Sequence, residues 1–481
     1  MYFHSLAFVL FFCILAVLYY LLPKAQRWLL LCGNVLFYAS ADPRMLVYLV
    51  VCIGLTYLAG CRIFRSSGAA RRAWLIVALS ADLAALVVFK YTDFILSVFS
   101  PTRLNLAVPL GISYITFQTV TYLVDAYKEK LSSPVNFLDY ALYVSFFPTV
   151  TQGPIEKARD LLPQFQKPHP FDGKAVRAGV WFMLFGLLLK MSLADLVAIP
   201  VNAVFSAPSA FSGADVLFAT VLFAVQLYAD FAGYSLIALG AARVLGIGIH
   251  RNFRQPYHSA TVSEFWRRWH ISLNDWLKEY LYIPLGGNRR GAVRKYVNLL
   301  VVFLVSGIWH GAAVGYLIWG ALNGVYVVLE QLLSARRRGS DRPAPRRAPF
   351  LCQLRTTLLV GITWIFFRAG TWENIRAVFS RILFHLEPFD FIIRAAKAAY
   401  YYRSDKLLTL LGMKYYQIVV AFVLLAIMDH KEDKDPGLIL RISEKPLIPR
   451  MAILFAVLFG ILIFGVYGYG YQAAAFVYTQ F

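Results

Sequence analysis

The sequence has few charged residues, and acidic side chains are the scarcer kind. Only 15% of its 481 residues are charged and 59% are hydrophobic, with 26 Asp and Glu against 47 Lys and Arg. Soluble globular proteins carry about 25% charged and roughly 45–50% apolar residues. The composition therefore excludes an ordinary soluble domain and is typical of a polytopic membrane protein. Because the basic residues lie in the gaps between apolar runs, they indicate cytoplasmic loops rather than nucleic-acid binding.

Several sequence motifs of enzymes are also missing. The five cysteines form no CxxC pair, so neither a disulfide framework nor a cysteine metal site is expected. No HExxH or HxxxH spacing surrounds His270 or His310, and no GxSxG elbow occurs. The sequence therefore predicts no metal site and no serine-hydrolase triad. We expect no bound cofactor.

Long apolar runs predict an all-α, polytopic integral membrane protein. A bilayer core requires about 20 apolar residues per helix, and about eleven segments approach or exceed that length. Residues 105–127 carry Pro109, Gly111 and Gln118, which predicts a broken or re-entrant segment. Because the first apolar run has no basic region before it, we expect a transmembrane helix there, not a cleaved signal peptide. Residues 1–481 are interpreted as one membrane domain. The eleven segments lie near 5–22, 28–40, 45–63, 73–98, 178–200, 214–245, 297–311, 313–333, 352–367, 412–428 and 450–468.

Arginine-rich gaps predict the orientation of the chain. Residues 335–347 hold six Arg and one Asp among Pro, Gly and Ser, which indicates a flexible cytoplasmic loop. Residues 61–72 carry four Arg and no acid, and we expect them on the same side. The region 250–295, with nine Lys or Arg against three acids, is assigned there too. The basic cytoplasmic face also fits attraction to anionic lipids.

An aromatic, amphipathic helix is predicted within 263–284. Ser263 is a good N-cap, and the 4-3-4 spacing from Trp269 to Tyr280 places large apolar side chains on one face. Glu264 and Arg268 form a favourable i,i+4 pair. Such a helix is expected to lie in the membrane interface.

Two histidines stand apart from the other six, which lie near chain ends or in polar gaps. His310 is the one ionisable residue of the apolar run 303–324. Such residues at membrane depth usually face a cavity or a partner. A packing histidine bonded to a carbonyl and a catalytic base are both compatible with this position. His270 lies inside the predicted amphipathic helix, four residues before Asn274.

A third polar position at membrane depth is Asp230, in the stretch VQLYADFAGYS. It is predicted either to line a pathway or to pair with an arginine, for instance Arg243 or one of 250–254.

Motifs in two neighbouring regions identify a resemblance. The block NFRQPYHSATVSEFWRRWHISLNDWLKEYLYIPLGGNRRG, followed by SGIWHGAA, resembles the membrane-bound O-acyltransferase (MBOAT) family. The resemblance is to its bacterial branch of alginate O-acetyltransferase membrane subunits, with peptidoglycan and teichoic acid relatives. Supporting stretches are VPLGISYITFQTVTYLVDAY, FFPTVTQGPI, TWIFFRA and the terminal FVYTQF. The family's D-F-S-G-Y-S-D reads DFAGYSL here, starting at Asp230, and its W-H-I-S-L-S ends in Asn274.

The resemblance implies a multi-pass O-acyltransferase of the bacterial inner membrane, with a funnel or pore-like core. His310 matches the family's catalytic histidine and His270 its second motif histidine. We expect His310 to accept the proton of an attacking hydroxyl. Asn274, Trp309 and Asp230 are candidates for substrate binding or oxyanion stabilisation, and the basic Arg267 and Arg268 are candidates for steering an anionic donor.

The expected donor is an acyl thioester, either acetyl-CoA or an acyl carrier protein. An extracytoplasmic acyltransferase partner and a polysaccharide acceptor such as alginate are implied by the resemblance. D-alanyl or peptidoglycan acylation by the same mechanism is an alternative. A protein that catalyses no reaction, either a transporter or a scaffold, is the alternative from a different functional class. The inverted repeat expected of a transporter is not visible in the sequence.

Overall fold

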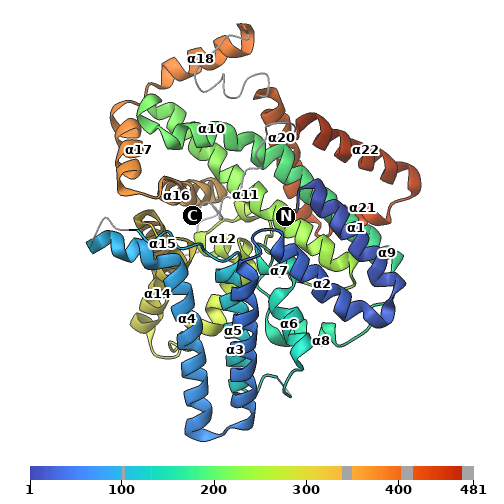
Figure 1. Cartoon of the computed structure of the whole chain (residues 1–481). Coiled ribbons are helices and arrows are strands. Elements are labelled where there is room, and N and C mark those ends of the chain that lie inside the picture. Colours follow the sequence, from blue (N-terminus) through green and yellow to red (C-terminus); the bar gives the residue numbers. More distant parts are fainter. Residues whose placement is uncertain (100–102, 132, 339–348, 402–414, 468–481) are drawn as a thin grey trace. The chain divides into compact units, whose positions relative to one another are not determined.

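The computed structural model describes residues 1–99, 103–131, 133–338, 349–401 and 415–467. The predicted loop 335–347 lies outside them from residue 339 onward, as does the terminal FVYTQF. Within the described residues there is no β-strand; the single isolated bridge joins Phe253 and Trp269. The described residues form an all-α protein, as the long apolar runs of the sequence predict (Figure 1).

Contacts divide the chain into two compact units, each assembled from separate stretches of sequence. Unit 1 comprises Met1–Gly186, Tyr234–Arg251 and Ile439–Lys445, and unit 2 comprises Leu187–Gly233, Asn252–Leu438 and Pro446–Phe481. Unit 1 contains α1 (Leu6–Leu21), α2 (Gln26–Ala39), α3 (Met45–Arg65), α4 (Gly68–Phe99), α5 (Ile112–Tyr127), α6 (Phe137–Ser145), α7 (Phe147–Val150), α8 (Ala158–Phe165), most of α9 (Gly173–Leu189), the end of α11 (Gly213–Val244) and most of α21 (Leu438–Glu444).

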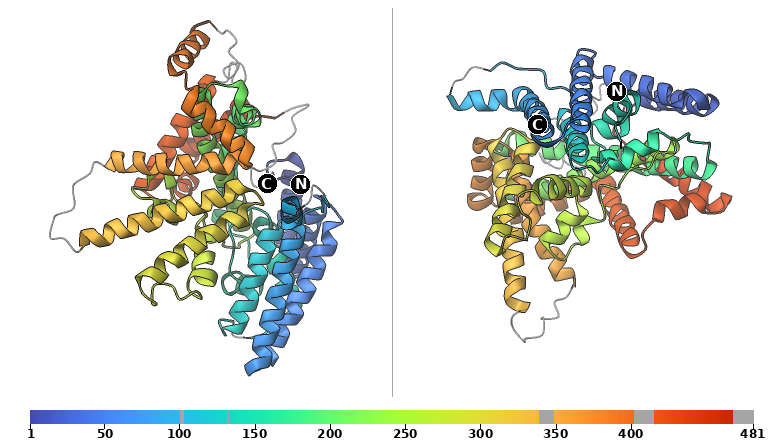
Figure 2. Two further views of the ribbon diagram at one scale, coloured as in Figure 1. Left: turned by 90° about the vertical axis from the view of Figure 1, so that its left-hand side faces the viewer. Right: turned by 90° about the horizontal axis from the view of Figure 1, so that it is seen from below.

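Unit 2 holds the remaining helices, including the ones that carry His270 and His310. They are α10 (Asp195–Ser206), most of α11, α12 (Val262–Arg268), α13 (Ile271–Leu277), α14 (Ala292–His310), α15 (Val314–Arg338), α16 (Pro349–Ala369), α17 (Trp372–Phe384), α18 (Pro388–Tyr401), α20 (Tyr415–Lys434) and α22 (Leu447–Phe464). Within this unit α14 packs along α15, and α15 along α16, an arrangement visible in both views of Figure 2.

Within the described residues, each of the eleven predicted segments overlaps a helix, but fewer helices are long and apolar enough to span a membrane. Among the described residues eight helices qualify, or nine if α1 and α2, bent by 112°, form one broken span. The first two are only 16 and 14 residues long. The last turns of α20 carry the charged run 429–434, which shortens its apolar part. The broken segment predicted at 105–127 begins without helix and becomes α5 only at Ile112.

A buried ion cluster joins three segments of unit 2. Between α9 and α10 the chain makes a π-helical turn, Lys190–Ala194, and π-bulges often mark functional sites. The ammonium of Lys190 lies 2.8 Å from Asp195 Oδ1 and 2.7 Å from Asp230 Oδ1, and all three side chains are at most 2% exposed. The sequence suggested an arginine as a partner of Asp230. The structure corrects that suggestion, because the π-turn directs Lys190 toward α11.

Candidate active site

The two histidines that the sequence singled out line one cavity in unit 2. The cavity has a volume of about 360 Å³ and is bounded by α12, α13, α14, α15 and the π-helical turn Lys278–Tyr282. Its volume lies at the lower end of the range of about 300–1,000 Å³ for small-molecule sites. Arg267 and Lys278, both exposed, belong to its lining, whereas His270 and His310 are buried. The cavity thus connects basic surface residues with two buried imidazoles.

His310 is the last residue of α14 and is 5% exposed. Its ring is surrounded by aromatic rings, with centroid distances of 4.9 Å to Trp309, 5.0 Å to Trp319 and 5.4 Å to Phe367. Three aromatic neighbours fix the plane of the imidazole and exclude water from most of its surface. This setting is a dry site in which a proton acceptor can be held at one position.

The glycines beside His310 allow α14 and α15 to approach closely. A Cβ on Gly307 would lie 2.4 Å from the carbonyl oxygen of Tyr316, and one on Gly320 would lie 2.5 Å from that of Phe303. Gly307 therefore makes room for the backbone of α15. A Cβ on Gly311 would lie 2.4 Å from the ring of Tyr316. Helix crossing therefore determines where His310 lies.

We expect Gly307→Ala to destabilise the protein and to reduce activity together. The added methyl group meets backbone rather than a movable side chain, and overpacking of this kind costs about 1–3 kcal/mol. Gly361→Ala is the matched control, because a Cβ there meets nothing within 4 Å and alanine favours a helix. Thermal unfolding of the purified variants checks this prediction. Equal melting temperatures for Gly307→Ala and wild type would contradict the role assigned to Gly307.

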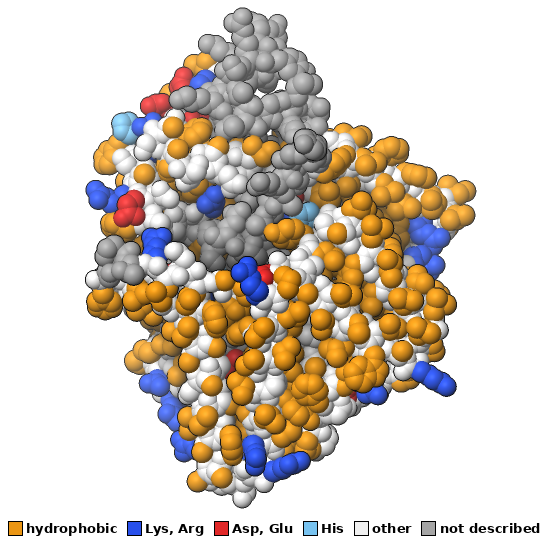
Figure 3. Space-filling model, viewed as in Figure 1, with side chains coloured by type: hydrophobic (Ala, Val, Ile, Leu, Met, Phe, Trp, Pro, Cys, Tyr) orange, Lys and Arg blue, Asp and Glu red, His pale blue; other side chains and the backbone are white. Residues whose placement is uncertain are grey.

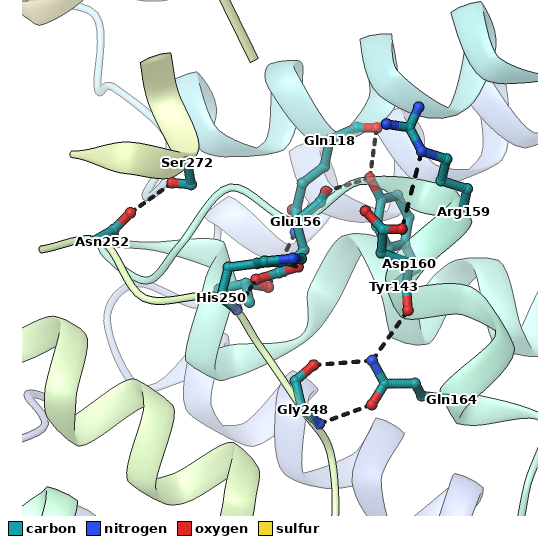
Figure 4. Close-up of polar contacts among 11 residues, drawn as sticks. Gln118, Tyr143, Glu156, Arg159, Asp160, Gln164, Gly248, His250, Asn252 and Ser272 are labelled. Carbon is teal, nitrogen blue, oxygen red and sulfur yellow. Dashed lines mark hydrogen bonds and ion pairs between the residues drawn. The ribbon is translucent and has the colours of Figure 1, made fainter. Parts of the chain in front are cut away.

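The predicted continuous helix over 263–284 is interrupted at His270. Helix α12 ends at Arg268 and α13 begins at Ile271. The cause is long-range: Arg254 N–H donates to the carbonyl of Arg268 and Ile271 N–H to that of Asn252, each at 2.9 Å. These bonds pull the backbone of 268–271 out of helical geometry. The Ser272 hydroxyl also donates to the Asn252 side chain at 2.6 Å (Figure 4).

The N-cap of α12 also differs from the prediction. The cap is Thr261, whose hydroxyl accepts from Glu264 N–H at 3.1 Å. Ser263 instead lies in the first turn, where Glu330 of α15 accepts its N–H and hydroxyl. The predicted pair of Glu264 and Arg268 is confirmed at 2.8 Å. Glu330 therefore fixes the start of α12 against α15.

His270 occupies the break in a left-handed conformation, with φ of 45°. Non-glycine residues rarely adopt this region, and they cluster at functional sites. The side chain is 1% exposed and its ring lies 4.6 Å from Phe231 and 6.0 Å from Trp309. Neither ring nitrogen has a hydrogen-bond partner within the described part of the chain. Because buried polar groups are normally paired, these nitrogens are available to a ligand in the cavity.

Burial lowers the pKa of His270 from 6.5 to about 3, so the folded protein holds it neutral at physiological pH. In the unfolded chain its pKa returns to about 6.5. As pH falls from 6.5 toward 3, the unfolded state binds a proton that the folded state does not, and stability declines.

We expect His270→Asn to weaken this acid sensitivity. Asparagine tolerates the left-handed backbone and does not titrate. The difference between melting temperatures measured at pH 7.5 and pH 5 in detergent should be smaller for His270→Asn than for wild type. Equal differences would show that His270 is not held neutral by burial.

The remaining predicted site residues separate into two groups. Arg267 and Asn274 line the cavity. The amide nitrogen of Asn274 donates to the carbonyls of Trp269 at 2.7 Å and His270 at 3.1 Å, so Asn274 holds the break in place. Arg268 is turned to Glu264 and, at 2.6 Å, to Asp433.

Asp230 and Trp309 are not among the lining residues of the cavity. Asp230 belongs to the ion cluster with Lys190. The indole of Trp309 contacts the rings of both histidines and thereby connects their positions.

Several lining residues were not predicted as site residues from the sequence, among them the polar Lys278, Ser306 and Gln331. The side-chain oxygen of Gln331 is buried and has no hydrogen-bond partner among the residues described. Lys278 and Gln331 are common surface types in helices, so no local sequence signal distinguishes them. Only the packing of α15 against α12 and α14 brings Gln331 to the cavity.

Unit 1 contains a separate polar cluster around Glu156, shown in Figure 4. The buried carboxylate of Glu156 accepts the backbone N–H of His250 at 2.6 Å and lies 2.7 Å from its Nδ1. The hydrogen bond and charge of Glu156 raise the pKa of His250. Gln164 exchanges two hydrogen bonds with the backbone of Gly248. These contacts hold the chain that follows α11 in place and give His250 a structural role.

Comparisons with known proteins identify the family of the chain. The MBOAT, membrane-bound O-acyltransferase family matches residues 44–367, a stretch that includes the whole cavity. The chain is 36% identical over 389 residues to the probable alginate O-acetylase AlgI of Pseudomonas aeruginosa, covering 77% of this chain and 73% of that protein. It is 35% identical over 387 residues to the peptidoglycan O-acetyltransferase of Helicobacter pylori, covering 74% and 72%.

A more distant relative is the teichoic acid D-alanyltransferase of Bacillus subtilis, 28% identical over 235 residues, covering 46% of this chain and 58% of that protein. The extent of the family match and the apolar helices lead to one conclusion. The chain belongs to the membrane-bound O-acyltransferase family and is a multi-pass O-acyltransferase of the bacterial inner membrane.

Proposed function

We propose that the protein transfers an acetyl group from a cytoplasmic thioester to hydroxyl groups of an extracytoplasmic polysaccharide, with His310 as the general base. The observation that carries this proposal is the cavity that joins basic surface residues to two buried histidines. Relatives that act on alginate and on peptidoglycan support the reaction class. A partner acyltransferase outside the membrane completes the proposed route to the polymer.

The proposed reaction assigns a separate task to each end of the cavity. Arg267 and Lys278 attract the phosphates of coenzyme A or of a carrier protein, because cationic rims raise the local concentration of anions. The acyl thioester then enters toward His310. The hydroxyl oxygen attacks the carbonyl carbon as its proton passes to the His310 imidazole. The thiolate leaves when the intermediate collapses, and the imidazolium returns the proton to it.

His270 supports this step from the same cavity, where its ring contacts Trp309. Being neutral, its imidazole has one N–H donor and one acceptor nitrogen. We assign the donor to the oxyanion of the tetrahedral intermediate, since a donor in a dry site stabilises developing charge strongly. The aromatic rings around His310 exclude water, which protects the thioester from hydrolysis.

The test uses the full chain in sealed proteoliposomes with labelled acetyl-CoA on one side and a soluble polysaccharide on the other. Label on the polymer, with or without an added partner acyltransferase, is the expected result. Consumption of acetyl-CoA without transfer to alginate, but with transfer to peptidoglycan fragments, would reassign the acceptor. Use of D-alanyl carrier protein in place of acetyl-CoA would reassign the donor. Movement of label across the membrane without cleavage of the thioester would identify a carrier and overturn the proposal.

A further inference from the structure

A second cavity, larger than the one lined by His270 and His310, lies in unit 1. It is a groove of about 860 Å³ lined mainly by apolar side chains of α3 and α4, which run side by side in Figures 1 and 2. Alanines at 78, 81 and 85 follow the spacing of one helix face and leave the wall of α4 hollow. We propose that this groove is a binding site for an anionic phospholipid of the surrounding bilayer.

The groove extends over most of the thickness of the hydrocarbon core, so the acyl chains of a lipid from one leaflet can lie within it. Its lining includes Arg44, directly before α3, and Arg62, in the last turn of α3. At the helical rise per residue, Arg44 and Arg62 are about 27 Å apart along the axis, close to the hydrocarbon thickness of about 30 Å. Exposed Val47, Val51 and Leu55 form the wall between them. Acyl chains are therefore the occupant that fits the apolar walls.

Basic side chains define the end at which a phosphate would lie. Arg62, Arg65 and Arg72 are exposed around the turn between α3 and α4, and none of them forms an ion pair with an acid in the described part of the chain. The neighbouring Arg71, by contrast, pairs with Glu129. Figure 3 shows basic side chains at this end and hydrophobic ones along the helices.

Two further features point to a headgroup at the same end. Helix α4 begins at Gly68, and the free N–H groups of a helix N-terminus favour anions. Arg62 lies 5.8 Å above the ring of Trp74, and tryptophan is enriched at the level of lipid headgroups. The arginines, the helix N-terminus and Trp74 together select a negatively charged headgroup, since each basic residue near an anionic leaflet contributes about 1 kcal/mol.

The one acid in the lining does not oppose this assignment. Asp82 lies ten residues beyond Arg72 on α4, about 15 Å along the axis. Its carboxylate is buried, accepts the Thr119 hydroxyl at 2.5 Å and lies 3.9 Å from Cys52 Sγ. The Asp82 carboxylate therefore lies at the level of the acyl chains and not beside the phosphate.

The experiment is native mass spectrometry of the full chain after exchange into mixed phosphatidylglycerol and phosphatidylcholine micelles. Wild type should retain phosphatidylglycerol at least tenfold over phosphatidylcholine. The variant R62Q/R65Q/R72Q should lose this preference, and Ala81→Phe, which fills the groove while leaving the arginines intact, should lose bound lipid of both kinds.

The matched control is K24Q/K167Q/K174Q, which removes three exposed charges of unit 1 away from the groove, and it should behave as wild type. Equal retention of both lipids by wild type, or unchanged preference in R62Q/R65Q/R72Q, would overturn the proposal. Occupation by a phosphoisoprenoid or by a second copy of the chain would also overturn it. Lipid retention is measured without acyl transfer. The lipid-binding proposal can therefore fail while the proposed function holds, and the reverse.

Discussion

Replacing His310 with alanine is expected to reduce acyl transfer by about 10²–10⁴-fold, the contribution of a positioned general base. The side chain is buried among three aromatic rings, which hold the imidazole at one position in the cavity. Envelope acetylation in cells that express equal amounts of inserted protein is the first measurement. Purified protein in proteoliposomes then gives the fold-change in rate.

Two further variants distinguish loss of the base from loss of structure. His310→Gln keeps a polar side chain of similar reach but cannot accept the proton, and it should be as inactive as His310→Ala. His385→Ala removes an exposed histidine of unit 2 and should leave the rate unchanged. Activity of His310→Gln near the wild-type level would assign a packing role to His310, the alternative that the sequence left open.

The second large effect is expected at Lys190, through stability. Removing one partner of a buried ion pair costs about 3–5 kcal/mol, because the remaining charges stay desolvated. Lys190→Met takes away the ammonium that contacts both Asp195 and Asp230. We expect a strongly lowered melting temperature and poor recovery of folded protein. Lys174→Met, at an exposed lysine near the start of α9, is the matched control.

A variant without any of the three charges tests whether the ion contacts cause the loss of stability. K190M/D195N/D230N removes all three charges and should recover most of the stability lost in Lys190→Met, since a neutral replacement of a buried cluster is often tolerated. If the triple variant is no more stable than the single one, the ion contacts do not explain the effect. Because Asp230 adjoins Phe231, whose ring contacts His270, transfer activity should recover along with stability.

The sequence predicted the membrane class and the helical segments because both depend on local composition. Apolar runs form helices in lipid wherever they occur, since their backbone groups must bond internally. The failures arose at chain ends and breaks. Helices α1 and α2 are apolar, but each is too short to qualify as a span by itself. The interruption at His270 depends on Asn252 and Arg254, which are distant in the sequence.

Only those residues of the candidate site that belong to sequence motifs could be predicted. His270 and His310 were predicted, and the structure brings both to one cavity. Arg268 and Asp230 resembled site residues because charge inside or beside a membrane suggests function, yet both are engaged in ion pairs away from the cavity. Gln331 carries no local signal at all. Its contribution follows from the close approach of α14 and α15 at Gly307 and Gly320.

The most direct test of the central claim is release of free coenzyme A from acetyl-CoA by the full chain in proteoliposomes, with a hydroxyl acceptor present. We predict steady release by wild type and a fall of at least 10²-fold for His310→Ala, at equal protein and equal melting temperature. Equal release by the two proteins would contradict His310 as the base.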